Sequence, residues 1–452
     1  MSTRNIQASS FRVAEQLGAH LGHGTAVPLH PVPVPKTALS RLPTKTLVRS
    51  LLLTSLMTKP WIMRPSLAIL SVLTKSDSLL LSPDRNPVLN QLLRWSIYDQ
   101  FCAGTSRRDV RRTMAEMKRV GYQGIILGFA KEIVLSASHS GAHANGAEYS
   151  PAMYKMIEDW KDEVLKTLQM IGSEDWLAVK VTGAGPVAVD AMKAGKPMPP
   201  AVQAALFDIC EATQRQGSRL WIDAEQQALQ PGLDEWVIEL MRKFNRGQTL
   251  VTNTIQAYLK GARANADRHV ALAAREGWNV GLKLVRGAYI EHEPRQLIHD
   301  TKEDTDRCYD GISSMFINQT LPEAARGATK FPASVLFLAT HNQASAHKAF
   351  AAHSKRVEAG LPTTVLESGQ VMGMADELSC ELLDNYDNCV EAGTMDRKSI
   401  PKIFKFLTWG SVSECMGYLH RRAVENRGAV ERTNNMTEAL TKELWQRVFG
   451  RA

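Results

Sequence analysis

Apolar runs of strand length recur eight times along the chain, and each run is rich in β-branched residues. A continuous apolar run without polar alternation is typical of a strand buried on both faces of a parallel sheet. The predicted strands are residues 124–130, 176–183, 220–224, 250–258, 280–288, 334–340, 363–369 and 403–409.

Longer stretches with helical period separate most of these runs. The predicted helices include residues 106–120, 153–170, 201–214, 235–244, 296–317 and 344–358. Strands that alternate with helices form a parallel sheet covered by helices on both faces. Eight such units predict an α/β fold of the (β/α)8, or TIM-like, barrel type, and an open doubly wound sheet is the alternative architecture.

Side chains of the types that serve in catalysis or ligand binding lie at the ends of five successive predicted strands. They are Lys180, Asp223, Glu225, Gln256, Lys283, Arg286, His341 and Asn342. Each of them alone is more often a solvated loop residue. In a barrel, however, all the carboxyl ends of the strands share one mouth, where active sites lie. The repetition therefore indicates an active site at this mouth.

The stretch GYLHRRAVEN, residues 417–426, carries the most distinctive local pattern. On a helix, Tyr418 and Arg422 are four residues apart, as are Arg421 and Glu425, so each pair shares a face. Two adjacent guanidinium groups can hold a carboxylate in bidentate fashion. The same pattern also fits an exposed basic helix turn with one salt bridge, and the residues alone leave both interpretations open.

Composition and charge exclude several classes of protein. Of the 452 residues, 44% are hydrophobic and 22% are charged, as in soluble globular proteins. Residues 1–75 hold nine bases and one acid, so this segment alone carries +8, the net charge of the whole chain. The remainder is neutral, whereas a nucleic-acid-binding domain carries its positive charge within the fold. We therefore expect no nucleic-acid partner.

The basic segment has the pattern of a mitochondrial transit peptide. It is rich in Arg, Ser, Thr and Leu, and KTLVRSLLLTSLMTK combines bases and leucines in an amphipathic pattern. A basic tail without a targeting role is the alternative. Residues 61–81 are apolar in patches but interrupted by Arg64, Pro65, Lys75 and Asp77, so we expect them to lie on a membrane surface without crossing it.

Cysteine and glycine patterns argue against other kinds of site. The six cysteines are scattered without a CxxC pair, which fits a reducing compartment such as the mitochondrial matrix and predicts no structural metal. His292 and Glu293 begin like HExxH, but Pro294 follows and the spacing fails. Gly183 and Gly185 begin like GxGxxG, but Ala188 breaks the motif, so a Rossmann dinucleotide site is not supported.

A set of separated motifs follows in order along the chain from about residue 84 to residue 433. The motifs are FCAGTS with ILGFAKE, LAVKVTG, LWIDAEQQA, IQAYLK, LKLVRGAYIEHEPR, LATHN, QVMGMADEL and YLHRRAVEN. Taken together, they resemble the proline dehydrogenase (proline oxidase) family, above all its fungal mitochondrial members. Each motif is weak alone, but their combination in this order is highly specific.

The resemblance implies a distorted (β/α)8 barrel with an N-terminal helical segment and non-covalent FAD at the carboxyl ends of the strands. It also implies oxidation of L-proline to Δ1-pyrroline-5-carboxylate, the first step of proline catabolism to glutamate, by hydride transfer to flavin N5. Electrons would pass to ubiquinone at the matrix side of the mitochondrial inner membrane, with which the protein makes peripheral contact. Residues 1–75 would be the transit segment and residues 76–452 the catalytic domain, so we expect removal of residues 1–75 to abolish import but not activity in vitro.

The resemblance also carries residue roles onto matching positions. Arg421 and Arg422 match the pair that holds the substrate carboxylate, with Lys180 and Asp223 beside them and Tyr289 over the substrate. The positions that match flavin or dinucleotide contacts are Gln256, Lys283, Arg286, Thr340, His341 and Glu425. Lys283 stands where bacterial relatives use Arg near flavin N5.

Two positions depart from the family pattern. Phe406, in KFLTWG, replaces a Tyr that packs on the substrate ring, and Ile255 stands where close relatives often place Tyr. Both changes leave open a dehydrogenase of another cyclic imino acid, such as hydroxyproline or pipecolate, or a catalytically weakened relative that binds proline or FAD. Without the resemblance, a barrel aldolase with Lys180 or Lys283 as Schiff base is a further alternative.

Overall fold

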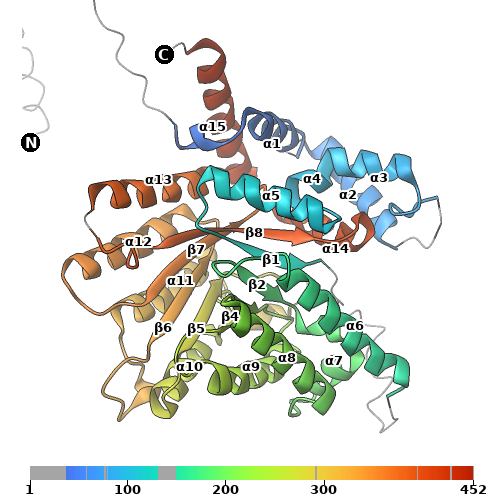
Figure 1. Cartoon of the computed structure of the whole chain (residues 1–452). Helices are drawn as coiled ribbons and strands as arrows, with labels where there is room; N and C mark the ends of the chain where they lie inside the picture. The colour runs from blue at the N-terminus through green and yellow to red at the C-terminus, as the bar shows by residue number, and fades with distance from the viewer. Residues whose placement is uncertain are drawn as a thin grey trace, which may run out of the picture.

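Eight parallel strands close into a barrel in which each strand pairs with the next and β8 pairs with β1 (Figure 1). The computed structural model describes residues 37–57, 59–75, 78, 80–130, 149–290, 293–393, 395–427 and 430–450. The strands are β1 (Gly124–Phe129), β2 (Trp176–Val179), β3 (Arg219–Ile222), β4 (Val251–Gln256), β5 (Val280–Val285), β6 (Ser334–Ala339), β7 (Val365–Val371) and β8 (Lys402–Trp409).

The closed barrel confirms the predicted fold class and excludes the open doubly wound sheet. All eight predicted strands are present. The second to fifth strands end two to four residues earlier than predicted. The difference is largest at the second, because the chain turns into a 3-10 helix at Val181–Ala184 directly after Lys180. The apolar pattern continues through this turn, since Val181 and Ala184 are also buried, and so the pattern alone cannot mark the end of the strand.

The helices lie around the barrel and follow the strands in alternation. They are α5 (Arg107–Val120), α6 (Pro151–Leu168), α7 (Pro186–Lys193), α8 (Pro200–Gln216), α9 (Gln230–Phe244), α10 (Ala262–Glu276), α11 (Lys302–Asn318), α12 (Gln343–Glu358), α13 (Asp376–Ala392), α14 (Val412–Arg427) and α15 (Val430–Phe449). The helix predicted from residue 296 begins only at Lys302, because Thr301 and Asp304 form a capping box there.

Two cores are built by the alternation of side chains along the strands. Residues that point outward pack against the helices, while the barrel interior is filled by large side chains such as Trp176, Trp221, Phe337 and Phe404. The Trp221 and Phe337 rings lie 5.0 Å apart in an edge-to-face arrangement. The interior is therefore packed, and a site can form only at an end of the barrel.

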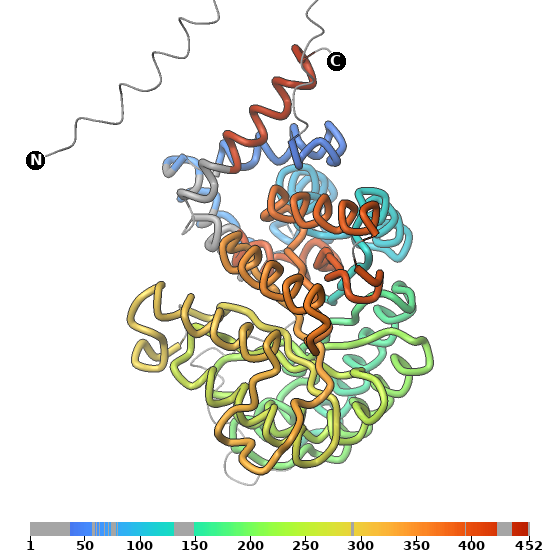
Figure 2. Tube along the Cα trace, turned by 90° about the vertical axis from the view of Figure 1, so that its left-hand side faces the viewer, coloured from blue at the N-terminus to red at the C-terminus, as the bar shows by residue number. Residues whose placement is uncertain are grey.

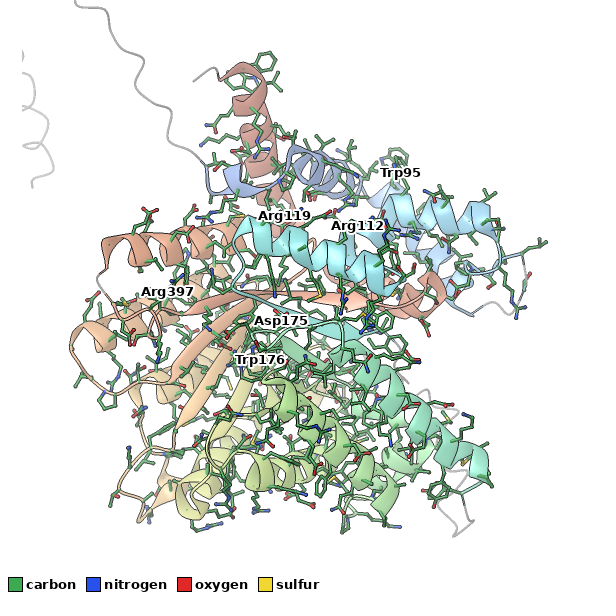
Figure 3. The ribbon with its side chains drawn as sticks, viewed as in Figure 1. Trp95, Arg112, Arg119, Asp175, Trp176 and Arg397 are labelled. Carbon is green, nitrogen blue, oxygen red and sulfur yellow. The ribbon has the colours of Figure 1, made fainter. Side chains whose placement is uncertain are left out.

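The amino-terminal end of the barrel is closed by an aromatic and ionic plug. The Arg219 guanidinium lies 4.1 Å from the centre of the Trp176 ring and donates to the buried Glu367 carboxylate at 2.7 Å. Trp176 Nε1 donates to the same carboxylate at 3.1 Å. Figure 3 shows Trp176 and Asp175 at the start of β2. This end is filled, so the mouth lies at the opposite end.

An N-terminal layer of helices packs on the barrel. It comprises a 3-10 turn (Ala38–Arg41), α1 (Thr44–Met57), α2 (Pro60–Lys75) and α3 (Pro87–Leu93). In both views α1 lies beside α15, on one side of the barrel (Figures 1 and 2). The predicted N-terminal helical segment is thus present, whereas the predicted boundary between residues 75 and 76 stays a prediction.

Candidate active site

The site begins with an ion pair between Asp223, directly after β3, and the buried Lys283 of β5. Lys283 Nζ donates to Asp223 Oδ1 at 2.5 Å, and the same ammonium lies 4.0 Å from the centre of the Trp221 ring. The Asp223 N–H donates to the Val179 carbonyl at 2.9 Å, which extends the pairing of β2 with β3 by one residue. Strand register therefore places two predicted site residues in contact.

The environment of Lys283 disfavours its charged form. Burial lowers the pKa of Lys283 from its ordinary value, and the positive charge of Lys180 lowers it further. The Asp223 carboxylate acts in the opposite direction without outweighing burial. The ammonium is thus held beside one carboxylate and over an aromatic ring. Because its pKa is lowered, Lys283 loses its proton at a lower pH than an ordinary lysine does.

Tyr289, in the loop after β5, and Lys180, directly after β2, are joined to each other and to Glu225. The Tyr289 hydroxyl lies 3.1 Å from Glu225 Oε2 and 3.2 Å from the Ala224 carbonyl oxygen, and it accepts from Lys180 Nζ at 3.4 Å. Thr182 donates to the other oxygen of Glu225 at 2.9 Å. Lys180, Tyr289 and Glu225 therefore form one hydrogen-bonded chain. Glu225 is buried and is one of the strand-end residues that the sequence placed at the mouth, although no specific role was predicted for it.

Gln256 joins two loops of the site through its amide. Its Nε2 donates to the Glu225 carbonyl at 3.1 Å, and its Oε1 accepts the Ala288 N–H at 3.1 Å. Ala288 precedes Tyr289. The amide thus fixes the loop after β3 relative to the loop that carries the tyrosine, and Gln256 positions the site in addition to its predicted contact with a cofactor.

Arg286 is held in one orientation by side chains from three elements. Its guanidinium donates to Asp306 at 2.7 and 3.0 Å, to Thr340 Oγ1 at 2.8 Å and to Ser345 Oγ at 2.9 Å. Burial alone would raise the pKa of Asp306, but hydrogen bonds from Lys302 and Arg286 outweigh it and lower that pKa. Arg286 and Thr340 were both predicted, whereas Asp306 and Ser345 were not.

His341 connects the ends of two neighbouring strands. Its Nε2 accepts the backbone N–H of Val371 at 3.3 Å, and it directly follows Thr340 in the chain. The imidazole therefore lies on the same side of the mouth as the Arg286 network.

An apolar wall completes the mouth. The ring of Phe406, from β8, stacks on Trp221 with 6.2 Å between the ring centres and 13° between the planes. Ile255, by contrast, packs in the core between the barrel and the helices. Its departure from the family pattern is thus outside the mouth, while that of Phe406 is inside it. Trp221 contacts both Phe406 and Lys283. The sequence predicted it only as an apolar residue of a strand, with no role at the site.

The predicted arginine pair lies on α14, the helix that follows the carboxyl end of β8 (Figure 1). Arg421 and Arg422 are half-buried, and the Arg422 guanidinium lies 5.2 Å from the centre of the Tyr418 ring. Tyr418 and Phe406 belong to the same apolar cluster. The predicted i,i+4 partner Glu425 has its side chain outside the described residues, so its role stays a prediction.

Comparison with solved structures supports the fold. Proline utilization A (PutA) from Bdellovibrio bacteriovorus, inactivated by N-propargylglycine, aligns with a TM-score of 0.61 and 14% sequence identity. The alignment covers 89% of this chain and 43% of that one.

Curated proteins show similarity at the level of sequence. Proline dehydrogenase 1, mitochondrial, of Caenorhabditis elegans is 33% identical over 251 residues, covering 54% of this chain and 37% of that protein. The probable mitochondrial proline dehydrogenase of Schizosaccharomyces pombe is 33% identical over 256 residues, or 53% of this chain and 49% of that protein. Hydroxyproline dehydrogenase of Rattus norvegicus is 26% identical over 411 residues, covering 80% of this chain and 83% of that protein.

The matched part thus spans less than half the length of the two proline dehydrogenases. The family model described as proline dehydrogenase matches residues 110–435, most of the chain and every strand of the barrel. The chain therefore belongs to the proline dehydrogenase family.

Proposed function

We propose that the protein oxidises L-proline to Δ1-pyrroline-5-carboxylate with FAD as cofactor and ubiquinone as electron acceptor. The observation that carries this proposal is the Lys283–Asp223 pair, with Lys283 over the Trp221 ring on which Phe406 stacks, at the mouth of a barrel of this family. The mitochondrial relatives and the basic N-terminal segment support a place on the matrix side of the inner mitochondrial membrane, where the reaction would begin the catabolism of proline to glutamate.

The residues at the mouth fit FAD. Lys283 and the fixed guanidinium of Arg286 offer positive charge for an anionic dinucleotide, and Thr340 and His341 offer polar groups beside them. The aromatic wall of Trp221 and Phe406 suits a flat ring system. FAD, held by these residues, would supply the hydride acceptor of the reaction, with ubiquinone as the electron acceptor.

The protein's own residues bind and orient the substrate. Arg421 and Arg422 would hold the proline carboxylate, since two planar guanidinium forks fit that anion. Tyr289, fixed through Glu225 and Lys180, would cover the ring. The reaction removes a hydride from the carbon beside the ring nitrogen and a proton from that nitrogen, which leaves a C=N bond. Orientation is therefore the main contribution of the chain.

A second candidate is the oxidation of another cyclic imino acid, such as hydroxyproline or pipecolate. It is favoured by Phe406, which lacks the hydroxyl of the family's tyrosine, and by the similarity to rat hydroxyproline dehydrogenase over 80% of the chain. A weakened relative that binds proline without turnover is also compatible with the change at Phe406.

An anaerobic visible spectrum of the purified protein, before and after addition of L-proline, tests the proposal. We expect oxidised flavin bands that bleach with proline. Bands that bleach only with hydroxyproline or pipecolate would favour the second candidate. Bands that persist with all three substrates would indicate the weakened relative, and a folded sample without flavin would contradict the proposal.

Replacement of Arg422 by Met is expected to raise the KM for proline about a hundredfold while FAD stays bound. The loss of one charged fork from a carboxylate costs about 2–3 kcal/mol, and about 1.4 kcal/mol corresponds to a factor of ten. Steady-state kinetics with a soluble dye as electron acceptor would measure the change. Arg422→Lys keeps the charge without the fork, so its KM should lie between those of the parent and of Arg422→Met. An unchanged KM in Arg422→Met would exclude this residue from the carboxylate clamp.

Replacement of Lys283 by Arg is expected to move the alkaline limb of the kcat/KM profile to higher pH. Lys283 is charged below its pKa, which burial lowers, so the wild-type protein should lose this charge below the ordinary value for lysine. A guanidinium stays charged throughout the measurable range. Lys155→Arg, on the exposed face of α6, is the matched control and should leave the profile unchanged. If the alkaline limb does not move in Lys283→Arg, it reports the titration of a group other than Lys283.

A further inference from the structure

A chain of buried polar side chains runs from the helices around the barrel to its mouth. At its centre lies Asp234 of α9, which is 4% exposed. One oxygen of its carboxylate accepts from Gln230 Nε2 at 2.8 Å and from Asn253 Nδ2 at 2.9 Å. The other oxygen accepts from Asn265 Nδ2 at 2.8 Å. Three neutral amides, from α9, β4 and α10, therefore converge on one carboxylate.

The outer end of this chain fixes which groups donate. His269 of α10 is fully buried, with its Nδ1 2.8 Å from the Asn265 carbonyl oxygen and its Nε2 3.0 Å from Asn253 Nδ2. A carbonyl oxygen only accepts hydrogen bonds, so Nδ1 carries the ring proton and Nε2 accepts from Asn253. Burial also lowers the pKa of His269 from its ordinary value, which favours this neutral ring. Both N–H groups of the Asn253 amide are then in use, one toward His269 and one toward Asp234.

Gln230 connects this carboxylate to the loop that follows β3. Because Asp234 accepts from the Nε2 of Gln230, the other end of the amide is turned toward the loop, where Oε1 accepts the Glu225 N–H at 2.8 Å. On the other side of the same residue, the Glu225 carbonyl accepts from Gln256 Nε2 at 3.1 Å. Two buried amides therefore hold the backbone of Glu225, one at its N–H and one at its carbonyl group.

The segment that these amides hold contributes three contacts to the candidate site. Asp223 pairs with Lys283. The Tyr289 hydroxyl lies 3.2 Å from the Ala224 carbonyl oxygen and 3.1 Å from Glu225 Oε2. Because residues 223–225 are consecutive in the chain, a shift of the Glu225 backbone moves all three contacts together. A displacement of about 1 Å in an active site can lower a reaction rate about a hundredfold.

We propose that Asp234 and Gln230 are positioning residues of the active site. Asp234 fixes the orientation of the Gln230 amide, and Gln230 in turn fixes the loop that carries Asp223 and Glu225. This inference rests on the proposed function for the reaction that the loop serves, whereas the hydrogen-bonded chain follows from burial and distances alone. Because orientation of the substrate is the main contribution of the protein to that reaction, a fixed loop raises its rate.

Replacement of Gln230 by Leu tests the inner step of the chain in the full-length, flavin-bound protein. Leucine fills most of the same space but has no hydrogen-bond acceptor, so the Glu225 N–H loses its partner. We expect the rate of flavin reduction by L-proline, measured anaerobically in a single turnover, to fall at least about tenfold while the flavin content stays unchanged. Hydrogen exchange of residues 223–229 should become faster in the same variant.

Replacement of Asp234 by Leu tests the outer step, because the proposal has Asp234 act on the loop through Gln230. We expect flavin reduction to slow in this variant too. The double variant, Asp234→Leu with Gln230→Leu, should be no slower than Gln230→Leu alone. Losses that multiply in the double variant would show that Asp234 acts by another route, which would overturn the proposal. Thermal midpoints of the three variants report any loss of stability separately.

The matched control is Gln216→Leu, because Gln216 precedes β3 in the chain whereas Gln230 follows it. The Gln216 amide donates to the Leu168 and Ile171 carbonyls, each at 3.0 Å, so its loss costs stability away from the mouth. Its flavin should be reduced as fast as that of the parent. An unchanged rate in Gln230→Leu, or an equal loss in the control, would overturn the proposal.

Hydrogen exchange separates this proposal from the proposed function. If proline does not bleach the flavin of the parent, the proposed function fails, and the exchange of residues 223–229 then decides the positioning role alone. Faster exchange in Gln230→Leu than in the parent and in Gln216→Leu would support that role. Equal exchange in all three proteins would overturn it.

Discussion

Removal of residues 1–75 is expected to leave no soluble, folded protein, whereas removal of residues 1–36 should leave the fold intact. Leu39, Leu42 and Leu47 are buried in a cluster with Leu382 of α13, Ile403 of β8 and Leu440 of α15. Leu70 and Leu73 of α2 are buried against α14. Burial of each leucine contributes about 1.5–3 kcal/mol, so the five together exceed about 7 kcal/mol, a large part of the net stability of a domain.

The sequence predicted that removal of residues 1–75 would leave activity in vitro intact. The two expectations differ because the sequence does not show which side of a helix is buried. Removal of residues 1–36 is the matched control, since it leaves all the described contacts in place. Soluble yield, flavin content and thermal midpoint of both truncations would be measured. A stable, flavin-loaded protein that begins at residue 76 would contradict the expectation and support a transit segment that ends at residue 75.

The barrel could be predicted from the sequence because its signal repeats. Each apolar run is short and lies between helical stretches, so an error at one strand, such as the overlong second strand, leaves the other seven in place. The N-terminal helices were harder to place. Their outward stripes look amphipathic in the same way as a transit peptide does, and only tertiary contacts show that Leu47 and Leu70 face the core.

The residues of the candidate site could be predicted where they lie at or near the ends of strands, as for Asp223 and Lys283, which form an ion pair. It was not predictable where contacts depend on register between distant segments. Asp306 and Ser345 lie on helices after other strands and meet only at Arg286. Trp221 was missed for a different reason, because a buried aromatic residue in an apolar run looks the same whether it faces a helix or the mouth.

A buried ion pair joins the stretches KFLTWG and QVMGMADEL through two residues to which the sequence assigned no role. Lys405, in KFLTWG, donates from Nζ to Asp376 Oδ1, in QVMGMADEL, at 2.7 Å. The same ammonium donates to the Met374 carbonyl and the Ser379 hydroxyl, each at 3.2 Å, so all three of its N–H groups have acceptors. Lys405 is 1% exposed. The pair fixes α13 to β8, the strand that carries Phe406.

Replacement of Asp376 by Asn is expected to lower the free energy of unfolding by about 3–5 kcal/mol, because it leaves a buried ammonium without its counter-ion. Burial alone would lower the pKa of Lys405, but attraction to Asp376 outweighs it and raises the pKa. A raised lysine pKa contributes stability that is fully present below the pKa of the unfolded chain, about 10.4, and is lost only as pH rises through the folded value. Urea unfolding at neutral pH would therefore measure the full contribution.

The paired variant Asp376→Leu with Lys405→Met separates the loss of a partner from the loss of packing. A buried ion pair replaced by apolar residues of similar volume is often neutral or stabilising, so this variant should recover most of what Asp376→Asn loses. Asp159→Asn, in the exposed pair with Lys155, is the surface control and should leave the urea midpoint unchanged. If Asp376→Asn is as stable as the parent, the pair is not required for the fold. If the paired variant is no more stable than Asp376→Asn, the ammonium's contacts with Met374 and Ser379 contribute more than its charge pairing does.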